Sequence, residues 1–425
     1  MIPSRNTRPC ASFNRTRSVG SRPIDSITPR SASATVIMRS KKDSETRRRQ
    51  PNQHTQATPR PVGPAWLTPP ENAIASHPLD DASTAAATHA PRDQYLRPLR
   101  DLRISVTDRC NFRCPYCMPR EVFGPDYAFL PPAAVLSDDE IERLSRLFVR
   151  AGVEKLRITG GEPLMRPGLP ELLGRLAAID GVRDLSLTTN AWFLARLAPA
   201  LAAAGLRRIN VSLDALSPDV FARMNGRGLG PSRVLEGIDS ALAAGLGVKV
   251  NMVVQRGVNE HEILPMARHF RALGITLRFI EYMDVGTTNG WRMEQVLPAR
   301  EIVRLVASDH PLEPVAPAYR GEVAARYRYV GTATEIGIIS SVTEPFCSAC
   351  HRARLSADGK LFTCLFAAHG HDLRALVREH ADDEFVFARL AAIWRARTDR
   401  YSDERSERLL AGEARPKVEM SFIGG

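Results

Sequence analysis

Six of the seven cysteines stand in two groups of three, and their spacing suits iron–sulfur chemistry. They are Cys110, Cys114 and Cys117 in the first group and Cys347, Cys350 and Cys364 in the second. A 4Fe–4S cube normally takes four cysteine ligands, so three thiolates hold three irons and leave the fourth open to a small chelating ligand. Each group therefore predicts a cluster with one free coordination position.

Disulfides and zinc are the competing interpretations of these cysteines. Three is an odd number for pairing, and disulfide frameworks belong mainly to small secreted domains. Zinc favours four ligands, and no histidine lies near the first group in the sequence. The second group differs, because His351 or His369 would complete a Cys3His zinc site. Spacing alone leaves that alternative open for the second group.

Five cations stand inside apolar runs or beside the second cysteine group. They are Arg103, Arg157, Lys249, Arg352 and Arg354. A cation on a core strand must be paired or must face a polar cavity. Any single one could form a salt bridge with a neighbouring carboxylate. Arginine forks onto phosphate or onto the edge of a base, so the five together indicate a pocket for a polyphosphate.

A Gly-Gly-Glu-Pro segment, residues 160–163, follows one of these apolar runs. On its own this is a weak signal, since Gly-Gly after a strand is usually a turn. Glycines also let the backbone approach a ligand closely. Glu162 can accept hydrogen bonds from an ammonium group. Taken together with the first cysteine group, the segment therefore predicts a cofactor contact.

Short runs rich in Val, Ile and Leu recur from residue 102 and alternate with helix-like stretches. The runs are 102–106, 155–159, 184–188, 208–213, 248–254 and 276–280. The stretch 138–150 opens with a capping box formed by Ser137 and Glu140. Six repeats imply parallel strands joined by right-handed crossovers, which form a full or partial barrel or an open doubly wound sheet. In either case the chemistry lies at the carboxyl ends of the strands.

The N-terminal part has a different composition. Residues 1–60 carry 11 Arg and 2 Lys but only three acidic residues, which accounts for ten of the eleven net positive charges of the chain. Charge confined to such a segment argues against nucleic-acid binding by the folded part. Residues 1–95 read as a disordered basic extension, an organellar transit peptide, or a mis-assigned start with Met38 as a later candidate. No run approaches the ~20 apolar residues of a membrane-spanning helix.

The chain from residue 102 onward resembles a known family. The first cysteine group, with Tyr116 before its last cysteine, resembles the signature of the radical S-adenosylmethionine (SAM) superfamily. Within it, the chain resembles the GTP 3′,8-cyclase family of molybdenum-cofactor biosynthesis. The motifs are Arg103-Ile-Ser-Val-Thr-Asp-Arg-Cys110, Arg157-Ile-Thr-Gly-Gly-Glu-Pro163, Thr188-Thr-Asn190, Asn210-Val-Ser-Leu-Asp214, Lys249-Val-Asn251, Glu281-Tyr-Met283, Cys347-x-x-Cys350, Ala357-Asp-Gly-Lys360 and Gly424-Gly425.

The resemblance implies an α/β fold with two folded parts. Residues 96–320 would form a partial (β/α)6 TIM-like barrel. Residues 321–425 would form a smaller domain that carries the second cluster and closes the barrel mouth. The first three cysteines would hold the SAM cluster and the last three a second 4Fe–4S cluster that binds GTP.

The resemblance also implies roles for individual residues. SAM would contact Tyr116, Gly161, Glu162, Ser212 and Met283. GTP would contact Arg103, Arg157, Thr188, Lys249, Arg352, Ala353 and Arg354. Of these, Arg352, Arg354 and Lys249 would serve catalysis. His351 and Ala353 depart from the family, which more usually has Asn and a larger apolar residue there.

The implied activity is the radical cyclisation of GTP to 3′,8-cyclo-7,8-dihydro-GTP. Reductive cleavage of SAM would give a radical that removes hydrogen from C3′ of the ribose, and that carbon would then bond to C8 of guanine. The expected partners are a flavodoxin- or ferredoxin-like electron donor and the downstream cyclic pyranopterin monophosphate synthase, in a cytoplasmic monomer or homodimer; the extension leaves organellar import open. The alternatives are a radical SAM peptide-modifying enzyme and a zinc-dependent binding module.

Overall fold

A computed structural model describes residues 90–380, 382–410 and 416–424 of the chain. The interpretations of residues 1–89 lie outside the described residues. Residues 90–95, the end of the predicted extension, belong to the described fold. There Asp93 is buried and accepts hydrogen bonds from the backbone N and from Nε of Arg97.

One twelve-stranded sheet organises the described residues. Its order is β12-β11-β10-β1-β2-β3-β4-β5-β6-β9-β8-β7. The six predicted strands form its centre, in parallel, within one residue of the predicted bounds. They are β1 (Asp101–Ser105), β2 (Lys155–Thr159), β3 (Asp184–Thr189), β4 (Arg208–Ser212), β5 (Gly247–Val254) and β6 (Thr276–Glu281). The two end strands, β12 and β7, do not pair with each other, so the prediction of a partial barrel is confirmed.

Strands from the C-terminal part extend this sheet at both edges. β10 (Arg352–Leu355) runs parallel to β1, and β9 (Glu335–Ile339) runs parallel to β6. Antiparallel strands complete the edges: β11 (Lys360–Phe362) and β12 (His371–Asp372) beside β10, and β8 (Ala325–Tyr329) and β7 (Leu312–Val315) beside β9. The sheet is thus continuous across residue 320, and the division into 96–320 and 321–425 stays a prediction.

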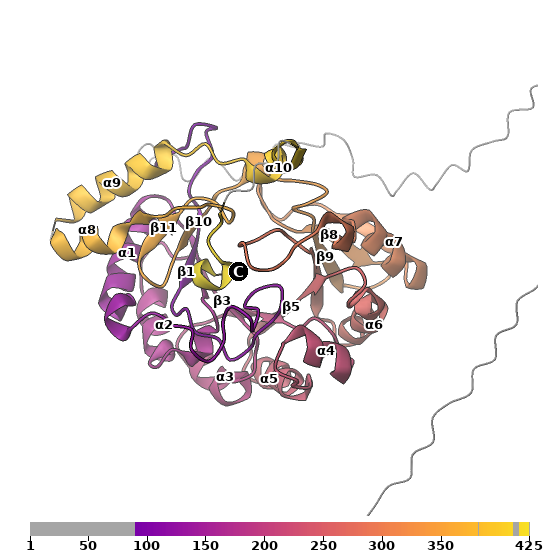
Figure 1. The fold of residues 1–425 in the computed structure, drawn as a ribbon. Coiled ribbons are helices and arrows are strands. Elements are labelled where there is room, and N and C mark those ends of the chain that lie inside the picture. Colours follow the sequence, from indigo (N-terminus) through magenta and orange to yellow (C-terminus); the bar gives the residue numbers. More distant parts are fainter. Residues whose placement is uncertain (1–89, 381, 411–415, 425) are drawn as a thin grey trace, which may run out of the picture. The chain divides into compact units, whose positions relative to one another are not determined.

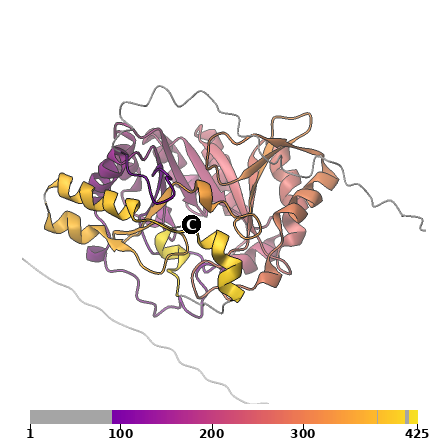
Figure 2. The same cartoon turned by 90° about the horizontal axis from the view of Figure 1, so that it is seen from above.

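Helices cover the outer side of the sheet (Figures 1 and 2). They are α1 (Asp138–Arg150), α2 (Leu169–Ala177), α3 (Leu194–Ala203), α4 (Pro218–Met224), α5 (Ser232–Ala243), α6 (Ile263–Ala272) and α7 (Ala299–Asp309). The predicted capping box starts α1, since Glu140 N donates to Ser137 Oγ at 3.2 Å and Ser137 N donates to Glu140 Oε2 at 2.7 Å. From the C-terminal part, α8 (Leu373–Glu379) and α9 (Asp383–Arg395) pack beside α1 (Figure 1).

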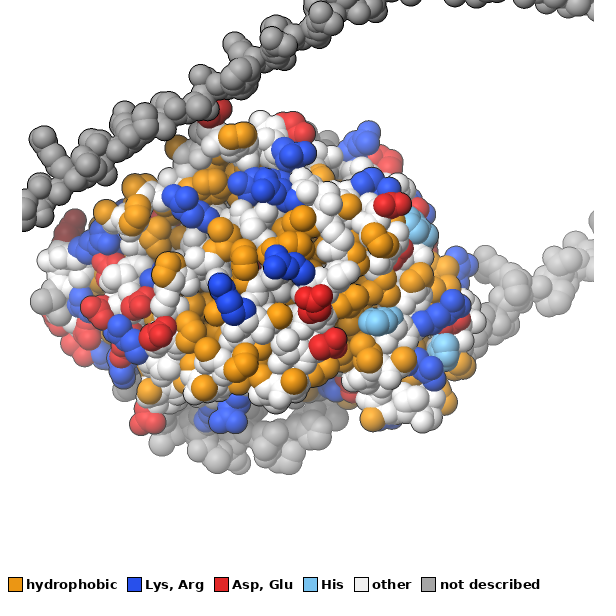
Figure 3. All heavy atoms as spheres, turned by 90° about the horizontal axis from the view of Figure 1, so that it is seen from below, with side chains coloured by type: hydrophobic (Ala, Val, Ile, Leu, Met, Phe, Trp, Pro, Cys, Tyr) orange, Lys and Arg blue, Asp and Glu red, His pale blue; other side chains and the backbone are white. Residues whose placement is uncertain are grey.

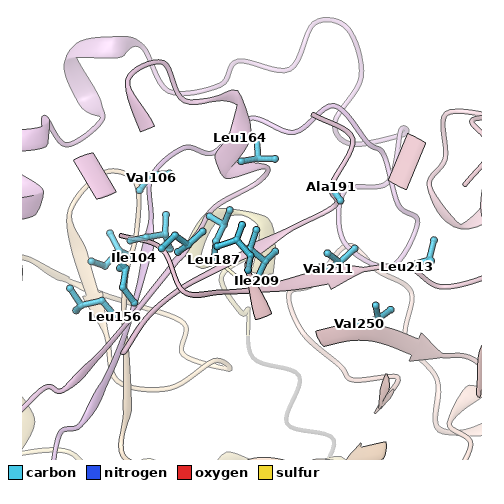
Figure 4. Packing of buried hydrophobic residues seen from close by; sticks show 14 of the residues in the cluster. Ile104, Val106, Leu156, Leu164, Leu187, Ala191, Ile209, Val211, Leu213 and Val250 are labelled. Atoms are coloured by element: carbon cyan, nitrogen blue, oxygen red, sulfur yellow. The ribbon is translucent and has the colours of Figure 1, made fainter. Parts of the chain in front are cut away.

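Strand alternation separates an apolar outer face from a polar inner face. Leu102 and Ile104 of β1 are buried in the hydrophobic cluster, whereas Asp101 and Arg103 line a cavity on the inner side. The other central strands repeat this pattern. Figure 4 shows the outer apolar side chains, among them Ile104, Leu156, Leu187 and Ile209, packed across neighbouring strands. Because the core lies between sheet and helices, the inner face is left free for polar residues.

One face of the molecule shows charges of both signs. On the face seen in Figure 3, Lys and Arg side chains are interspersed with acidic and apolar ones. No helix of the described residues is long and apolar enough to cross a lipid bilayer.

Candidate active site

One cavity on the inner side of the sheet is lined by all six grouped cysteines. Cys110, Cys114 and Cys117 come from the loop after β1, Cys347 and Cys350 from the segment between β9 and β10, and Cys364 from the segment after β11. All six are free thiols. Two groups that lie far apart in the sequence therefore share one site.

Gly160 and Gly161 hold the first cysteine loop against the end of β2. Gly161 N donates to Thr107 O at 2.8 Å, and Glu162 N donates to Arg109 O at 2.8 Å. A β-carbon on Gly161 would lie 2.4 Å from Arg109 O, and one on Gly160 would lie 2.6 Å from Thr107 O. The structure thus shows a close approach of this backbone to the cysteine loop. Both glycines also line the cavity, so their predicted approach to a ligand stays a prediction.

Glu162 is buried at the cavity wall, and its carboxylate joins its own segment to the end of β3. Its Oε1 accepts hydrogen bonds from Thr189 Oγ1 at 2.6 Å and from Leu164 N at 3.0 Å, and its Oε2 accepts one from Asn190 N at 2.7 Å. Burial raises the pKa of Glu162 to about 7, although the three hydrogen bonds act in the opposite direction and lower it. Each carboxylate oxygen has about two acceptor positions, so Oε2 retains one for a further donor.

Tyr116 is fixed at the cavity wall by a buried carboxyl group. Its Oη donates to Asp214 Oδ2 at 2.7 Å, and Asp214 Oδ1 accepts from Val253 N at 2.9 Å. Burial raises the pKa of Asp214 to about 6. Ser212 and Met283, from the ends of β4 and β6, line the same cavity.

Three arginines form a row across neighbouring strands of the inner face. In the sheet register Arg103 lies between Arg354 on β10 and Arg157 on β2, and all three line the cavity. Arg103 Nε and Arg157 Nε are buried without a hydrogen-bond partner among the described residues. Burial, together with Arg354 and Arg157, holds the pKa of Arg103 well below its usual value. Like charges opposite each other destabilise a sheet, so this row suits an anionic ligand.

Two further residues of the cavity were missed in the sequence. Arg278 lines it from β6, and burial with Arg157 and Arg208 lowers the pKa of Arg278 to about 10. Its place in the run 276–280 matches that of Arg157 in the run 155–159, so strand alternation could have identified it. Tyr319 lines the cavity from the loop between β7 and β8 and packs against Lys155, whose Nζ lies 3.3 Å from the ring centroid. No pattern in the sequence indicated Tyr319.

Cys350 receives hydrogen bonds from two guanidinium groups. Arg352 Nη2 and Arg397 Nη2 each donate to Cys350 Sγ at 3.3 Å. Although burial opposes it, these two arginines lower the pKa of Cys350 to about 6. Cys364 differs, because burial raises its pKa to about 12.

Neither histidine of the alternative zinc site lines the cavity. His351 is buried and packs against Tyr319, with ring centroids 6.1 Å apart, and His369 is exposed. In the described parts of the chain, no three His, Cys, Asp or Glu side chains are grouped so that they could hold a single metal ion. Thiolates of a 4Fe–4S cluster bind different irons, so a cluster does not require its cysteines to converge on a single metal ion.

The cavity brings together the predicted site residues with two exceptions, Lys249 and Ala353. Ala353 is fully buried in the hydrophobic cluster, because alternation along β10 turns it away from the side of Arg352 and Arg354. Its side chain therefore does not line the cavity, and its predicted contact with GTP stays a prediction. Lys249 is half-buried on β5 and does not line the cavity, and its role stays a prediction. Burial, Arg278 and Arg208 lower its pKa to about 8.

The C-terminal end of the described chain enters this site (Figure 1). Ile423 at the end of α11 (Met420–Ile423) is fully buried, and Gly424 O accepts a hydrogen bond from Arg354 Nε at 3.3 Å. Gly424 has a φ of 77°, and a β-carbon there would lie 2.1 Å from Thr159 Cγ2. The tail thus lies between the arginine row and the strand that leads into Gly160.

Comparisons with known proteins agree with this geometry. Residues 104–270 match the family model of the radical SAM superfamily, and residues 275–403 match that of Molybdenum Cofactor Synthesis C. Solved structures of Streptococcus suis SuiB bound to S-adenosylmethionine are similar at 18% identity and a TM-score of 0.41, over 50% of this chain and 47% of that chain. GTP 3′,8-cyclases of Staphylococcus epidermidis and Staphylococcus aureus are 48% identical over 335 residues, which cover 79% of this chain and 98% of each relative. The chain therefore belongs to the GTP 3′,8-cyclase family of radical SAM enzymes.

Proposed function

We propose that the chain uses SAM and two 4Fe–4S clusters to cyclise GTP to 3′,8-cyclo-7,8-dihydro-GTP, the first step of molybdenum-cofactor biosynthesis. The observation that carries this proposal is that both cysteine groups and the arginine row line a single cavity, with Nε of Arg103 and of Arg157 lacking a hydrogen-bond partner among the described residues. A radical SAM enzyme uses one 4Fe–4S cluster and SAM, and GTP is the substrate of this family. The second cluster and the roles of individual residues go beyond what membership of the family shows, so they form part of the proposal.

Cys110, Cys114 and Cys117 would hold the first cluster, whose remaining iron binds SAM. When bound, this cluster supplies the electron that cleaves SAM to methionine and a 5′-deoxyadenosyl radical. The chain itself orients SAM: the free acceptor position of Glu162 suits the ammonium group of its methionine part, while Tyr116, Ser212 and Met283 line the wall beside it. Gly161 contributes by holding the cysteine loop in place.

Cys347, Cys350 and Cys364 would hold the second cluster, whose open iron would orient the guanine base. Support comes from the position of His351 and His369, neither of which lines the cavity, so a Cys3His zinc site is not favoured. Arg352 donates to Cys350 Sγ and lines the cavity, which places a guanidinium group between this cluster and the arginine row.

The arginine row would bind the triphosphate. Arg103, Arg157 and Arg354 have buried guanidinium groups on adjacent strands, and a polyanion would relieve their mutual repulsion. Arg352, Arg354 and Lys249 would position GTP for the reaction, and Thr188 lies at the same wall. Fixing C3′ of the ribose next to the SAM site is the main contribution the protein makes, because the cofactors supply the reactive groups.

The partners of the enzyme are proposed from its membership of the family. A flavodoxin- or ferredoxin-like protein would donate electrons, and cyclic pyranopterin monophosphate synthase would use the product.

The second candidate function is that of a radical SAM peptide-modifying enzyme with an auxiliary cluster. The cavity argues for GTP, since a peptide substrate does not require three buried arginines side by side.

The proposal is tested by incubating the reconstituted protein with SAM, a reductant and each nucleoside triphosphate under anaerobic conditions. We expect 5′-deoxyadenosine and the cyclised product with GTP only, and about eight irons per chain without zinc. Equal formation of 5′-deoxyadenosine with all four nucleotides, or zinc in the second site, would contradict the assignment.

Lys249 gives a prediction that depends on pH. Its pKa of about 8 means that it loses its charge in the mildly alkaline range, where arginine stays protonated. If Lys249 contacts the triphosphate, kcat/KM for GTP falls as the pH rises through about 8, and the Lys249→Arg variant lacks this fall. The measurement is kcat/KM between pH 7 and 9.5 for both proteins, and the same alkaline fall in both would assign it to another group.

A further inference from the structure

Arg397 lies behind the second cysteine group in a buried ionic network. It follows α9, and its side chain is 1% exposed. Nη1 donates to Cys350 O at 2.9 Å and to Asp93 Oδ2 at 3.2 Å, and Nη2 donates to Cys350 Sγ at 3.3 Å. Nε donates to Asp399 Oδ2 at 3.3 Å. The guanidinium group is thus held on all sides, with one N–H group directed at a sulfur.

The same network fixes the backbone of the cysteine segment. Arg97 Nε donates to Asp93 Oδ2 at 2.6 Å, and Arg97 Nη1 donates to Cys347 O at 2.7 Å. The Asp93 side chain is 0% exposed, so its charge is compensated by Arg97 and Arg397 rather than by water. Such a buried network is expensive to form unless each member is paired, which indicates a function for its geometry.

The two cysteine groups differ in the donors that reach their sulfurs. In the first group, Cys110 Sγ accepts from the backbone N of Phe112 and from the neutral amide of Asn190. In the second group, Cys350 Sγ accepts from two charged groups, Arg352 and Arg397. Hydrogen bonds and positive charge at cluster sulfurs stabilise the reduced cluster, because reduction adds negative charge.

We propose that Arg397 is a positioning residue that raises the reduction potential of the second cluster through its hydrogen bond to Cys350, and that Asp93 limits this effect. The proposal rests on the second cluster of the proposed function. Arg352 also reaches Cys350, but it lines the cavity next to the arginine row and serves GTP as well. Arg397 also lines the cavity, but its donors are engaged by Asp93, Asp399 and Cys350, so it acts on the cluster through the cysteine ligand.

The test isolates the second cluster in the full chain by replacing Cys110, Cys114 and Cys117 with alanine. In this background the protein is reconstituted anaerobically, its iron is counted, and the midpoint potential is measured by redox titration followed by electron paramagnetic resonance. Arg397→Gln is expected to make reduction at least tenfold less favourable, which lowers the midpoint potential by about 59 mV for one electron. Arg397→Lys keeps the charge and should recover part of this shift.

Asp93→Asn should shift the potential in the opposite direction, because it removes the negative charge beside Arg397. In Arg397→Gln the buried Asp93 carboxylate keeps only Arg97 as a charged partner. The double variant with Asp93→Asn and Arg397→Gln removes that carboxylate, and its potential should lie below that of Asp93→Asn, so it tests the proposal if Arg397→Gln alone does not fold. Arg395→Gln is the matched control, since this exposed arginine lies two residues away, and it should leave the potential unchanged.

The outcomes separate the two proposals. Four irons per chain with an unchanged potential in Arg397→Gln, or with the same potential in the double variant as in Asp93→Asn, would overturn the role of Arg397 while leaving the second cluster in place. A background protein that binds no iron would overturn the second cluster and this inference with it. A shift in Arg395→Gln as large as in Arg397→Gln would show a general charge effect and would also overturn the specific role.

Discussion

Replacing Arg103 with methionine is expected to lower kcat/KM for GTP about a hundredfold and to stabilise the protein without substrate. A charged hydrogen bond to phosphate contributes about 1.5–3 kcal/mol, which corresponds to a factor of roughly 10 to 150 in affinity. Arg103 stands in the middle of the row, between Arg354 and Arg157, so its loss should affect binding more than the loss of an outer member.

The gain in stability follows from the same arrangement. Arg103 Nε is buried without a partner among the described residues, and its neighbours across the strands carry the same charge. Methionine has a similar length and needs no partner. Asp101 offsets part of this charge. Desolvation and the two like-charged neighbours outweigh that contribution, so an apolar side chain should raise the free energy of unfolding by about 1–2 kcal/mol, or a few degrees in Tm.

Arg208→Met is the matched control for this prediction. Arg208 Nε donates to Asp184 Oδ1 at 2.8 Å, so this arginine has a carboxylate partner and its loss leaves Asp184 unpaired. We expect a lower Tm for Arg208→Met and a higher Tm for Arg103→Met, both measured anaerobically with and without GTP. GTP should raise the Tm of the wild type by binding to the native state, and this rise should be largely lost in Arg103→Met. A lower Tm in both variants would contradict an anion site built from unpaired arginines.

The strands and the cysteine groups could be predicted because both depend on local sequence. Alternation of apolar and polar residues in each run fixes the bounds of β1 to β6 and turns Arg103 and Arg157 to the inner face. The same alternation predicts that the side chain of Ala353, which stands between two inward arginines, faces the core, as it does in the structure.

Contacts between distant segments could not be predicted in this way. Asp93 lies in a polar stretch that reads as disordered, yet it is buried by Arg397, 304 residues away in the sequence. The Gly-Gly pair suggested close approach to a ligand, but sequence alone cannot show that the loop at Thr107 and Arg109 crosses directly above it. In both cases the tertiary fold decides which residue makes the contact. The residue type indicates that a close contact is present but does not identify the residue on the other side.

Gly424→Ala is expected to lower GTP cyclisation about a hundredfold while both clusters assemble normally. The new β-carbon would lie 2.1 Å from Thr159 Cγ2, and the φ of 77° is unfavourable for alanine. The tail must then move, which takes Gly424 O away from Arg354. A displacement of about 1 Å in a group that positions the substrate can reduce the rate by ~10²-fold. The measurement is the rate of product formation, with iron content as the check on cluster assembly.

Two companion variants separate the clash from other effects of the substitution. Gly245→Ala introduces alanine at a φ of 78° with no atom within 4 Å of the new β-carbon, so it reports the backbone strain alone, and we expect normal activity. Thr159→Ser removes the methyl group that Gly424→Ala would meet, so combining the two should recover part of the activity. Because Thr159 directly precedes the Gly160–Gly161 pair and Arg354 belongs to the arginine row, this recovery would place the tail between the SAM site and the GTP site. Equal activity of Gly424→Ala and the wild type would instead mean that the tail leaves the cavity during turnover.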